Sequence, residues 1–118
     1  MSGNNFWILG LVGVVAVVAM RMLGGAGAAG GSMVMEKLKA GATIVDVRTP
    51  EEFADGSYPG AKNIPVQVIA SRLNEIPRDK PVVVFCRSGA RSASAAATLR
   101  EAGYTDVTNA GGLGNMPR

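Results

Sequence analysis

The segment that reads VFCRSGARS, residues 84–92, holds the side chains most suited to chemistry. It contains Cys86, which is the single cysteine of the 118-residue chain, and two arginines, Arg87 and Arg91. The chain has no histidine, so a nucleophilic cysteine would need something other than an imidazole to stabilise its thiolate. The same composition argues against a zinc site, because clustered thiolates and imidazoles are missing.

The loop after Cys86 is placed where an anion can be bound. Residues 81–86, PVVVFC, predict the strongest strand of the chain, and residues 91–102 predict an alanine-rich helix. A tight loop between the two turns its backbone N–H groups inward, beside the N-terminus of the helix. Such a nest, with the two neighbouring arginines, would stabilise a thiolate and orient an anionic substrate.

We therefore expect Cys86 to be the catalytic nucleophile. The expected substrate-binding residues are the remainder of the loop: Arg87, Ser88, Gly89, Ala90 and Arg91. Arg87 is the expected substrate-facing charge, because it adjoins the nucleophile. The alternative interpretation is a small buried cysteine that only ends a core strand, which is common for free cysteines.

Around this loop the sequence predicts alternating strands and helices. Short helices are expected at residues 33–40, 50–53 and 66–73, and extended segments at residues 43–47, 63–65 and 105–108. We expect Ser32 to cap the first helix and Thr49 to cap the second. The alternation predicts an α/β domain with a central parallel sheet flanked by helices, whose ligands bind at the carboxyl ends of the strands.

Three charged residues near residue 50 are expected to support the loop rather than to contact substrate. Arg48 and Glu52 are four positions apart, so we expect them to form an ion pair at a helix start. Asp46 is expected to hold loop backbone through its carboxylate.

The first 31 residues contain one charged side chain, Arg21. Residues 6–20 form an uncharged apolar run, and its extension to residues 4–23 gives a stretch long enough to cross a bilayer. The expected organisation is a transmembrane helix in residues 1–23, a flexible Gly/Ala-rich linker in residues 24–31 and a catalytic domain in residues 32–118. Basic residues after the run predict a single-pass membrane protein with a cytoplasmic domain, and a cleaved signal peptide that leaves a periplasmic or secreted domain is the alternative.

Four blocks of the sequence resemble the rhodanese family. CRSGAR matches the active-site pattern Cys-Arg-x-Gly-x-Arg at every fixed place. The second block is DVR at residues 46–48 followed by EF at residues 52–53, and the third is GAKNIP at residues 60–65. The fourth block is GY at residues 103–104 followed by NAGGL at residues 109–113. The blocks occur in the family's order, and the short form with its ending NAGGLGNMP is similar to the small phage-shock-type members.

The resemblance implies a sulfurtransferase that carries sulfane sulfur as a persulfide on Cys86. The implied donor is thiosulfate or a related small anion, the implied acceptor is a thiol or cyanide, and no metal or organic cofactor is needed. The four residues between Cys86 and Arg91 form a shorter loop than that of the phosphatases that resemble rhodaneses. The alternative is a membrane-tethered persulfide carrier or redox sensor that acts on a protein partner.

The charge distribution argues against nucleic acid as a partner. The net charge is +3 and the pI about 9.4, but the basic residues are scattered among acids and are not interleaved with aromatic residues. This mild excess favours small anions or an anionic membrane surface as partners.

Overall fold

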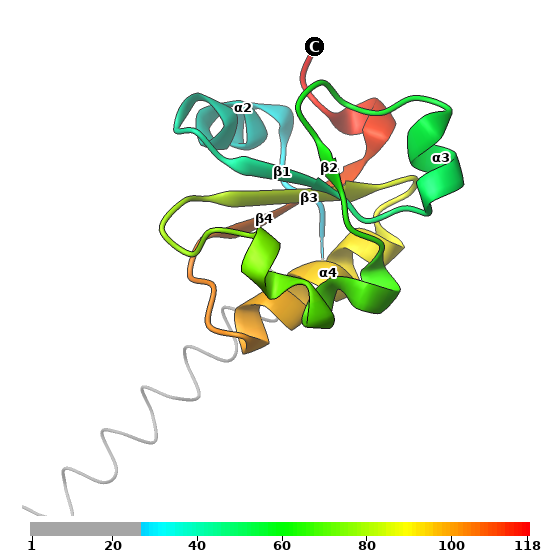
Figure 1. Cartoon of the computed structure of the whole chain (residues 1–118). Helices are drawn as coiled ribbons and strands as arrows, with labels where there is room; N and C mark the ends of the chain where they lie inside the picture. The colour runs from blue at the N-terminus through cyan, green and yellow to red at the C-terminus, as the bar shows by residue number, and fades with distance from the viewer. Residues whose placement is uncertain (1–26) are drawn as a thin grey trace, which may run out of the picture.

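The computed structural model describes residues 27–118, which fold around one parallel sheet (Figure 1). The helices and strands are α2 (Gly31–Lys39), β1 (Thr43–Asp46), α3 (Pro50–Ala54), β2 (Lys62–Asn63), β3 (Val82–Cys86), α4 (Ala90–Glu101) and β4 (Val107–Gly112). Residues 27–118 also contain three short 3₁₀ helices: η1 (Val66–Ser71), η2 (Leu73–Glu75) and η3 (Leu113–Asn115). The strand order is β2-β1-β3-β4, and every neighbouring pair is parallel, as the sequence predicted.

Helices cover both faces of the sheet, so the domain has two clusters of buried apolar side chains (Figure 1). One cluster joins β1 and β3 to α4 and η1 through residues such as Val84, Leu99 and Ile69. The other joins the opposite face to α2 and the C-terminal segment through Val34, Phe85 and further residues. All five residues of β3 are buried, which is the arrangement expected of a central parallel strand with helices on both sides.

The N-terminal boundary of the domain differs from the expectation. Helix α2 begins at Gly31, and its N-cap is Gly30 without a side-chain cap, so the predicted cap by Ser32 is wrong. The N–H of Ala29 donates to the carbonyl oxygen of Asn109 over 2.8 Å. Ala29, expected to be part of a flexible linker, is therefore hydrogen-bonded to β4, and Gly31 belongs to α2.

Two other segments differ from the sequence-based expectations. The single helix expected at residues 66–73 is two 3₁₀ helices, because the chain leaves helical geometry at Arg72, where φ is −122°. The last strand runs to Gly112 rather than ending at Thr108. The pairing with β3 continues to Gly112 across a bulge, which skips one residue of β4 between Asn109 and Gly111.

No helix among residues 27–118 is long and apolar enough to cross a membrane. The transmembrane helix expected in residues 1–23 lies outside the described residues, as does the first part of the expected linker.

Candidate active site

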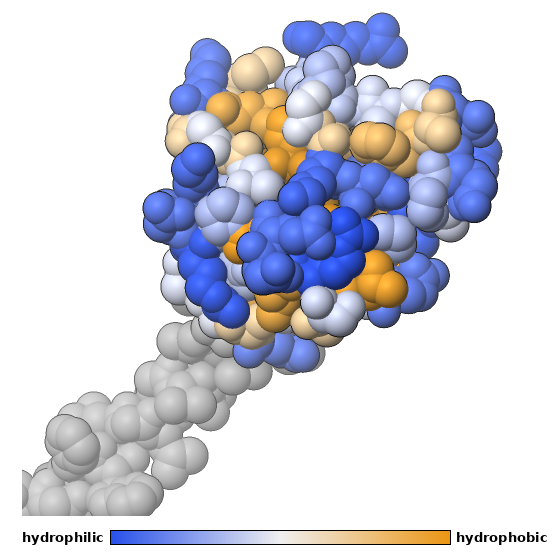
Figure 2. Space-filling model, in the orientation of Figure 1, coloured by the Kyte–Doolittle hydropathy of each residue, from blue (hydrophilic) through white to orange (hydrophobic). Residues whose placement is uncertain are grey.

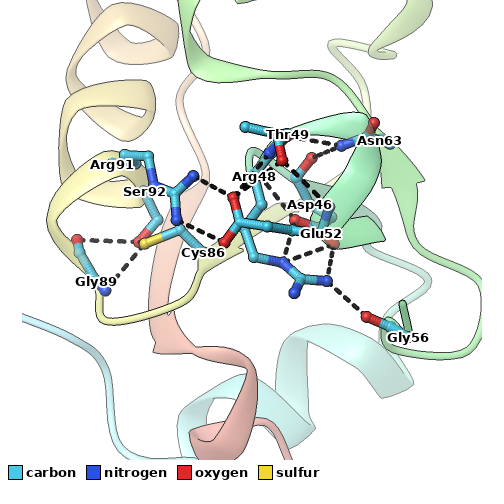
Figure 3. A network of polar contacts seen from close by, with 10 residues as sticks. All are labelled: Asp46, Arg48, Thr49, Glu52, Gly56, Asn63, Cys86, Gly89, Arg91 and Ser92. Atoms are coloured by element: carbon cyan, nitrogen blue, oxygen red, sulfur yellow. Dashed lines mark hydrogen bonds and ion pairs between the residues drawn. The ribbon is translucent and has the colours of Figure 1, made fainter. Parts of the chain in front are cut away.

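Cys86 is the last residue of the central strand β3, at the carboxyl end of the sheet. Its side chain is buried, and its Sγ accepts the backbone N–H of Gly89 over 2.9 Å (Figure 3). Gly89 is the N-cap of α4 and has a φ of +107°, a left-handed conformation that glycine adopts without steric cost. The strand, the glycine turn and the helix thus bring the sulfur back over the start of α4.

Hydrogen-bond donors surround this sulfur and stabilise its anionic form. Burial by itself would raise the pKa of Cys86, but the net pKa is lowered. The lowering comes first from the hydroxyl of Ser92 and then from the backbone N–H groups of Ser92, Gly89 and Ser88. The nest expected from the sequence is present, and its donors favour the thiolate without an imidazole.

Arg91 was expected to contact substrate, but its guanidinium pairs with Glu52 of α3. The two N–O distances are 2.6 Å from Nη1 to Oε1 and 3.0 Å from Nη2 to Oε2 (Figure 3). The predicted ion pair between Arg48 and Glu52 is therefore wrong. Arg48 precedes the N-cap Thr49, so it lies outside helix α3, and the four-residue spacing does not bring the two side chains together.

Glu52 is held in place by the start of its own helix. The Thr49 side chain accepts the N–H of Glu52 over 3.1 Å, and the Glu52 carboxylate accepts the N–H of Thr49 over 3.1 Å, which forms a capping box. The hydrogen bond from Arg91, followed by that from the Thr49 backbone, lowers the pKa of Glu52 to about 2. The ion pair therefore connects α3 to the start of α4 next to the active-site loop.

Asp46 and Arg48 form a second, more buried ion pair. The Asp46 side chain is fully buried and accepts the backbone N–H of Arg48, its Nε and its Nη2, the last over 2.6 Å. It also accepts the hydroxyl of Ser57 over 2.8 Å, while Arg48 donates to the carbonyl of Gly56 over 2.8 Å. Asp46 thus holds loop backbone as expected, and this network fixes the loop that follows α3.

A pocket of about 670 Å³ lies beside the loop. It is lined by Arg48, Glu52, Asp55, Gly56, Ser57, Arg87, Leu113 and Gly114. Arg87, the arginine expected to face substrate, is exposed at this pocket, whereas Ala90 is exposed at the first position of α4. Of the loop residues, the pocket lining includes Arg87, which directly follows Cys86 in the chain.

A family model for the rhodanese-like domain matches residues 32–113. The chain belongs to the rhodanese family. It is 50% identical over 66 residues to a sulfurtransferase of Allochromatium vinosum, and the match covers 56% of this chain and 62% of that protein. It is 42% identical over 71 residues to the thiosulfate sulfurtransferase PspE of Escherichia coli, and this match covers 58% of this chain and 68% of that protein.

Solved structures agree with this assignment. The human single-domain sulfurtransferase TSTD1 is 31% identical, with a TM-score of 0.65 over 72% of this chain and 88% of that one. An E. coli rhodanese with anions is 38% identical, with a TM-score of 0.61 over 64% of this chain and 94% of that one. The match spans only 62% and 64% of the length of two curated relatives, the A. vinosum protein and YqhL of Bacillus subtilis.

Sequence reasoning missed two residues of this rhodanese site. Ser92 follows the loop motif directly, and its Oγ lies 3.4 Å from the Sγ of Cys86. Its hydroxyl also donates to Oδ1 of Asn109 over 2.7 Å. The position of Ser92 just after the motif was a usable signal, but nothing in the sequence places Asn109, 23 positions from Cys86, beside it.

Proposed function

We propose that the chain is a sulfurtransferase that moves sulfane sulfur from thiosulfate, or a related donor, to a thiophilic acceptor through a Cys86 persulfide. The observation that carries the proposal is the buried sulfur at the end of β3, which accepts an N–H from Gly89 and has a lowered pKa. A thiolate is the nucleophile that this chemistry requires, and a persulfide anion needs the same donors. The names of the A. vinosum and E. coli relatives support sulfur transfer as the reaction class.

The reaction proceeds through two displacements at sulfur. In the first, the Cys86 thiolate attacks the outer sulfur of thiosulfate; a new S–S bond forms, the S–S bond of thiosulfate breaks, and sulfite leaves with the electron pair. In the second, cyanide or a thiolate attacks the outer sulfur of the persulfide, and the Cys86 thiolate leaves. Atoms and electrons balance without a metal or a redox cofactor, and the covalent intermediate predicts ping-pong kinetics.

The pocket beside the loop supports a small polar donor. Arg87 is exposed there, so its guanidinium is available to an anionic sulfonate group. Arg48 and Glu52 also line the pocket, but their charges are paired with Asp46 and Arg91. We assign Arg87 to donor binding, and Ser88 and Gly89 to stabilisation of the sulfur through their N–H groups.

Intact-mass spectrometry of the purified full-length chain tests the proposal. We expect incubation with thiosulfate to add one sulfur atom, peptide mapping to place it on Cys86, and cyanide to remove it with formation of thiocyanate. The Cys86→Ser variant is the control and should gain no sulfur. A folded protein with a free thiol that gains no sulfur from thiosulfate would rule out thiosulfate as donor.

A second candidate is a persulfide carrier that delivers sulfur to a protein. An apolar groove of about 680 Å³ adjoins the pocket and shares Leu113 and Gly114 with it. Its other apolar lining residues include Met35, Leu38, Ile44, Tyr58 and Met116. Figure 2 shows apolar surface between α2 and the C-terminal end, together with further apolar areas elsewhere on the same face. Stable persulfide loading with slow release to cyanide or small thiols would favour this candidate.

We further propose that residues 1–23 anchor the chain in a membrane, with the rhodanese domain on the cytoplasmic side. The support is the uncharged run at residues 6–20 and the basic residues that follow it. Retention of the full-length chain in the membrane fraction after an alkaline wash, together with an intact N-terminus, is the expected result. A mature chain that begins near residue 29 would instead indicate a cleaved signal peptide.

A further inference from the structure

Ser92 is buried and lies beside Cys86 and Gly89 (Figure 3), in a polar cluster that also includes the buried Asn109. Its Oγ lies 2.7 Å from Oδ1 of Asn109, 3.0 Å from the carbonyl oxygen of Gly89 and 3.4 Å from Sγ of Cys86. A further carbonyl oxygen, that of Gly111, lies 3.4 Å away. A serine hydroxyl has one proton, so it can satisfy only one of these acceptors well at a time.

The orientation of Asn109 is fixed by a second hydrogen bond. The backbone N–H of Gly111 donates to Oδ1 of Asn109 over 2.9 Å, which identifies the atom that faces Ser92 as the amide oxygen. This oxygen has no proton, so the Ser92 hydroxyl must donate to it. The lone pairs of Ser92 then face Cys86, where they accept the S–H of a thiol. A thiolate or a persulfide anion has no such proton to give, and a Ser92 hydroxyl that turns towards the sulfur can donate to it instead.

We propose that Asn109 is a positioning residue that competes with the sulfur of Cys86 for the proton of Ser92. In the thiol state the hydroxyl points to Asn109, and in the anionic states it points to sulfur. Asn109 is suited to this exchange because its oxygen keeps the N–H of Gly111 when the Ser92 proton leaves. The carbonyl of Gly89 is a weaker competitor, since its oxygen lies 3.0 Å from Oγ of Ser92, against 2.7 Å for Oδ1 of Asn109.

The other charged groups near the sulfur do not take part in this exchange. Arg91 is paired with Glu52, and this pairing is the main cause that raises the pKa of Arg91. The charge of Cys86 raises the pKa of Arg91 further, by a smaller amount. Arg87 adjoins Cys86 and is exposed, and the pair of Asp46 and Arg48 lies at the end of β1. None of these side chains has a hydrogen bond to Asn109 or Ser92 in the described part of the chain, so substitutions at residue 109 leave them in place.

The test is the pH dependence of Cys86 alkylation by iodoacetamide in the full-length chain and in Asn109→Leu. Leucine keeps the branching of asparagine but has no acceptor, so the Ser92 proton becomes available to the thiolate. The thiolate then gains one hydrogen bond, so we expect the pKa of Cys86 to fall by about 0.5–1 unit. In a Ser92→Ala background the same substitution should leave the pKa unchanged, because the residue that transmits the effect is absent.

The conservative variant Asn109→Asp should shift the pKa of Cys86 in the opposite direction. Its carboxylate can accept the same two hydrogen bonds as Asn109, from the Ser92 hydroxyl and the Gly111 N–H. A carboxylate accepts the Ser92 proton more strongly and adds negative charge, so we expect the pKa of Cys86 to rise by about one unit. Ser92→Ala should reduce this rise by half or more. If Asn109 only shaped the bulge of β4, the leucine variant would lower the melting temperature and raise the pKa through a loosened loop. That result, or equal shifts with and without Ser92, would overturn the proposal.

The inference rests on Cys86 as the sulfur carrier of the proposed function, but its test needs no turnover. If alkylation follows the expected pattern and no donor loads the sulfur, the proposed function fails while the role of Asn109 stands. If transfer is active and the alkylation profile is insensitive to residue 109, the role of Asn109 fails alone.

Discussion

Gly112, the last residue of β4, packs directly against the active-site loop and has no room for a side chain. A Cβ at this position would clash with the carbonyl oxygen of Arg87 and lie 3.2 Å from its carbonyl carbon. The backbone itself does not require glycine, because φ is −89° and ψ is 160°, values that alanine adopts readily. The substitution Gly112→Ala therefore tests a single contact, the one between the end of β4 and the loop.

The expected effect follows from the size of this overlap. An ordinary nonbonded contact is about 3.5 Å, so the methyl group must move the Arg87 carbonyl by roughly 1 Å. Overpacking of this kind costs about 1–3 kcal/mol, which for a domain of this size lowers the melting temperature by several degrees. The displaced peptide group carries the N–H of Ser88 and precedes that of Gly89, and both N–H groups stabilise the sulfur. A misplacement of about 1 Å at a reacting group can cost about 100-fold in rate, so we expect kcat/KM to fall by about that factor.

Thiocyanate formation from thiosulfate and cyanide, together with thermal unfolding, measures both effects. The matched control is Gly31→Ala at the start of α2, where an added methyl group meets no atom within 4 Å. We expect the control to retain activity and melting temperature. If Gly112→Ala retained the activity and thiol pKa of the unsubstituted chain, the backbone of the loop would not control the reactivity of Cys86, and the reasoning would be refuted.

Three further substitutions test separate parts of the site. Cys86→Ser should abolish transfer and leave the melting temperature nearly unchanged; retained turnover would contradict the persulfide mechanism. Arg87→Ala should raise KM for thiosulfate by roughly tenfold, the effect of one charge-assisted hydrogen bond, and should leave iodoacetamide labelling intact; an unchanged KM would remove Arg87 from donor binding. Glu52→Gln should lower the urea midpoint at pH 7. Because the pKa of Glu52 is depressed from 4.5 to about 2, its stabilisation is present above pH 4.5 and is lost as the pH falls towards 2. The difference in urea midpoint between the variant and the unsubstituted chain should therefore disappear over that pH range. A difference that does not depend on pH would contradict the role of this ion pair.

The sheet and the loop were predictable because local patterns determine them. The run of β-branched and aromatic residues at residues 81–86 is apolar at nearly every position, which is typical of a strand buried on both faces. A glycine three residues after Cys86 and an alanine-rich helix leave little freedom for the chain between them. These features placed the sulfur in its nest without reference to distant residues.

The supporting contacts were not predictable, because they join residues that are distant in sequence. Glu52 and Arg91 are 39 positions apart, and the rule of four-residue spacing paired Glu52 with Arg48 instead. That rule holds only within a helix, and the N-cap at Thr49 leaves Arg48 outside it. The bulge that brings Asn109 to Ser92 depends on the register of β4 against β3, which the pattern of apolar residues does not reveal.

The absence of histidine from the chain changes which residues control the nucleophile. With an imidazole base, reactivity depends on one side chain; here it depends on backbone N–H groups, the Ser92 hydroxyl and the start of α4. Apart from a change to proline, a substitution cannot remove a backbone donor, but it can move one. Their position depends on the residues that pack against the loop, and in β4 these are glycines. A Cβ placed on Gly89 would lie 3.5 Å from Cα of Gly111, and a Cβ placed on Gly112 would clash with the carbonyl oxygen of Arg87. The reactivity of Cys86 should accordingly be more sensitive to added volume at the end of β4 than to loss of charge around the pocket.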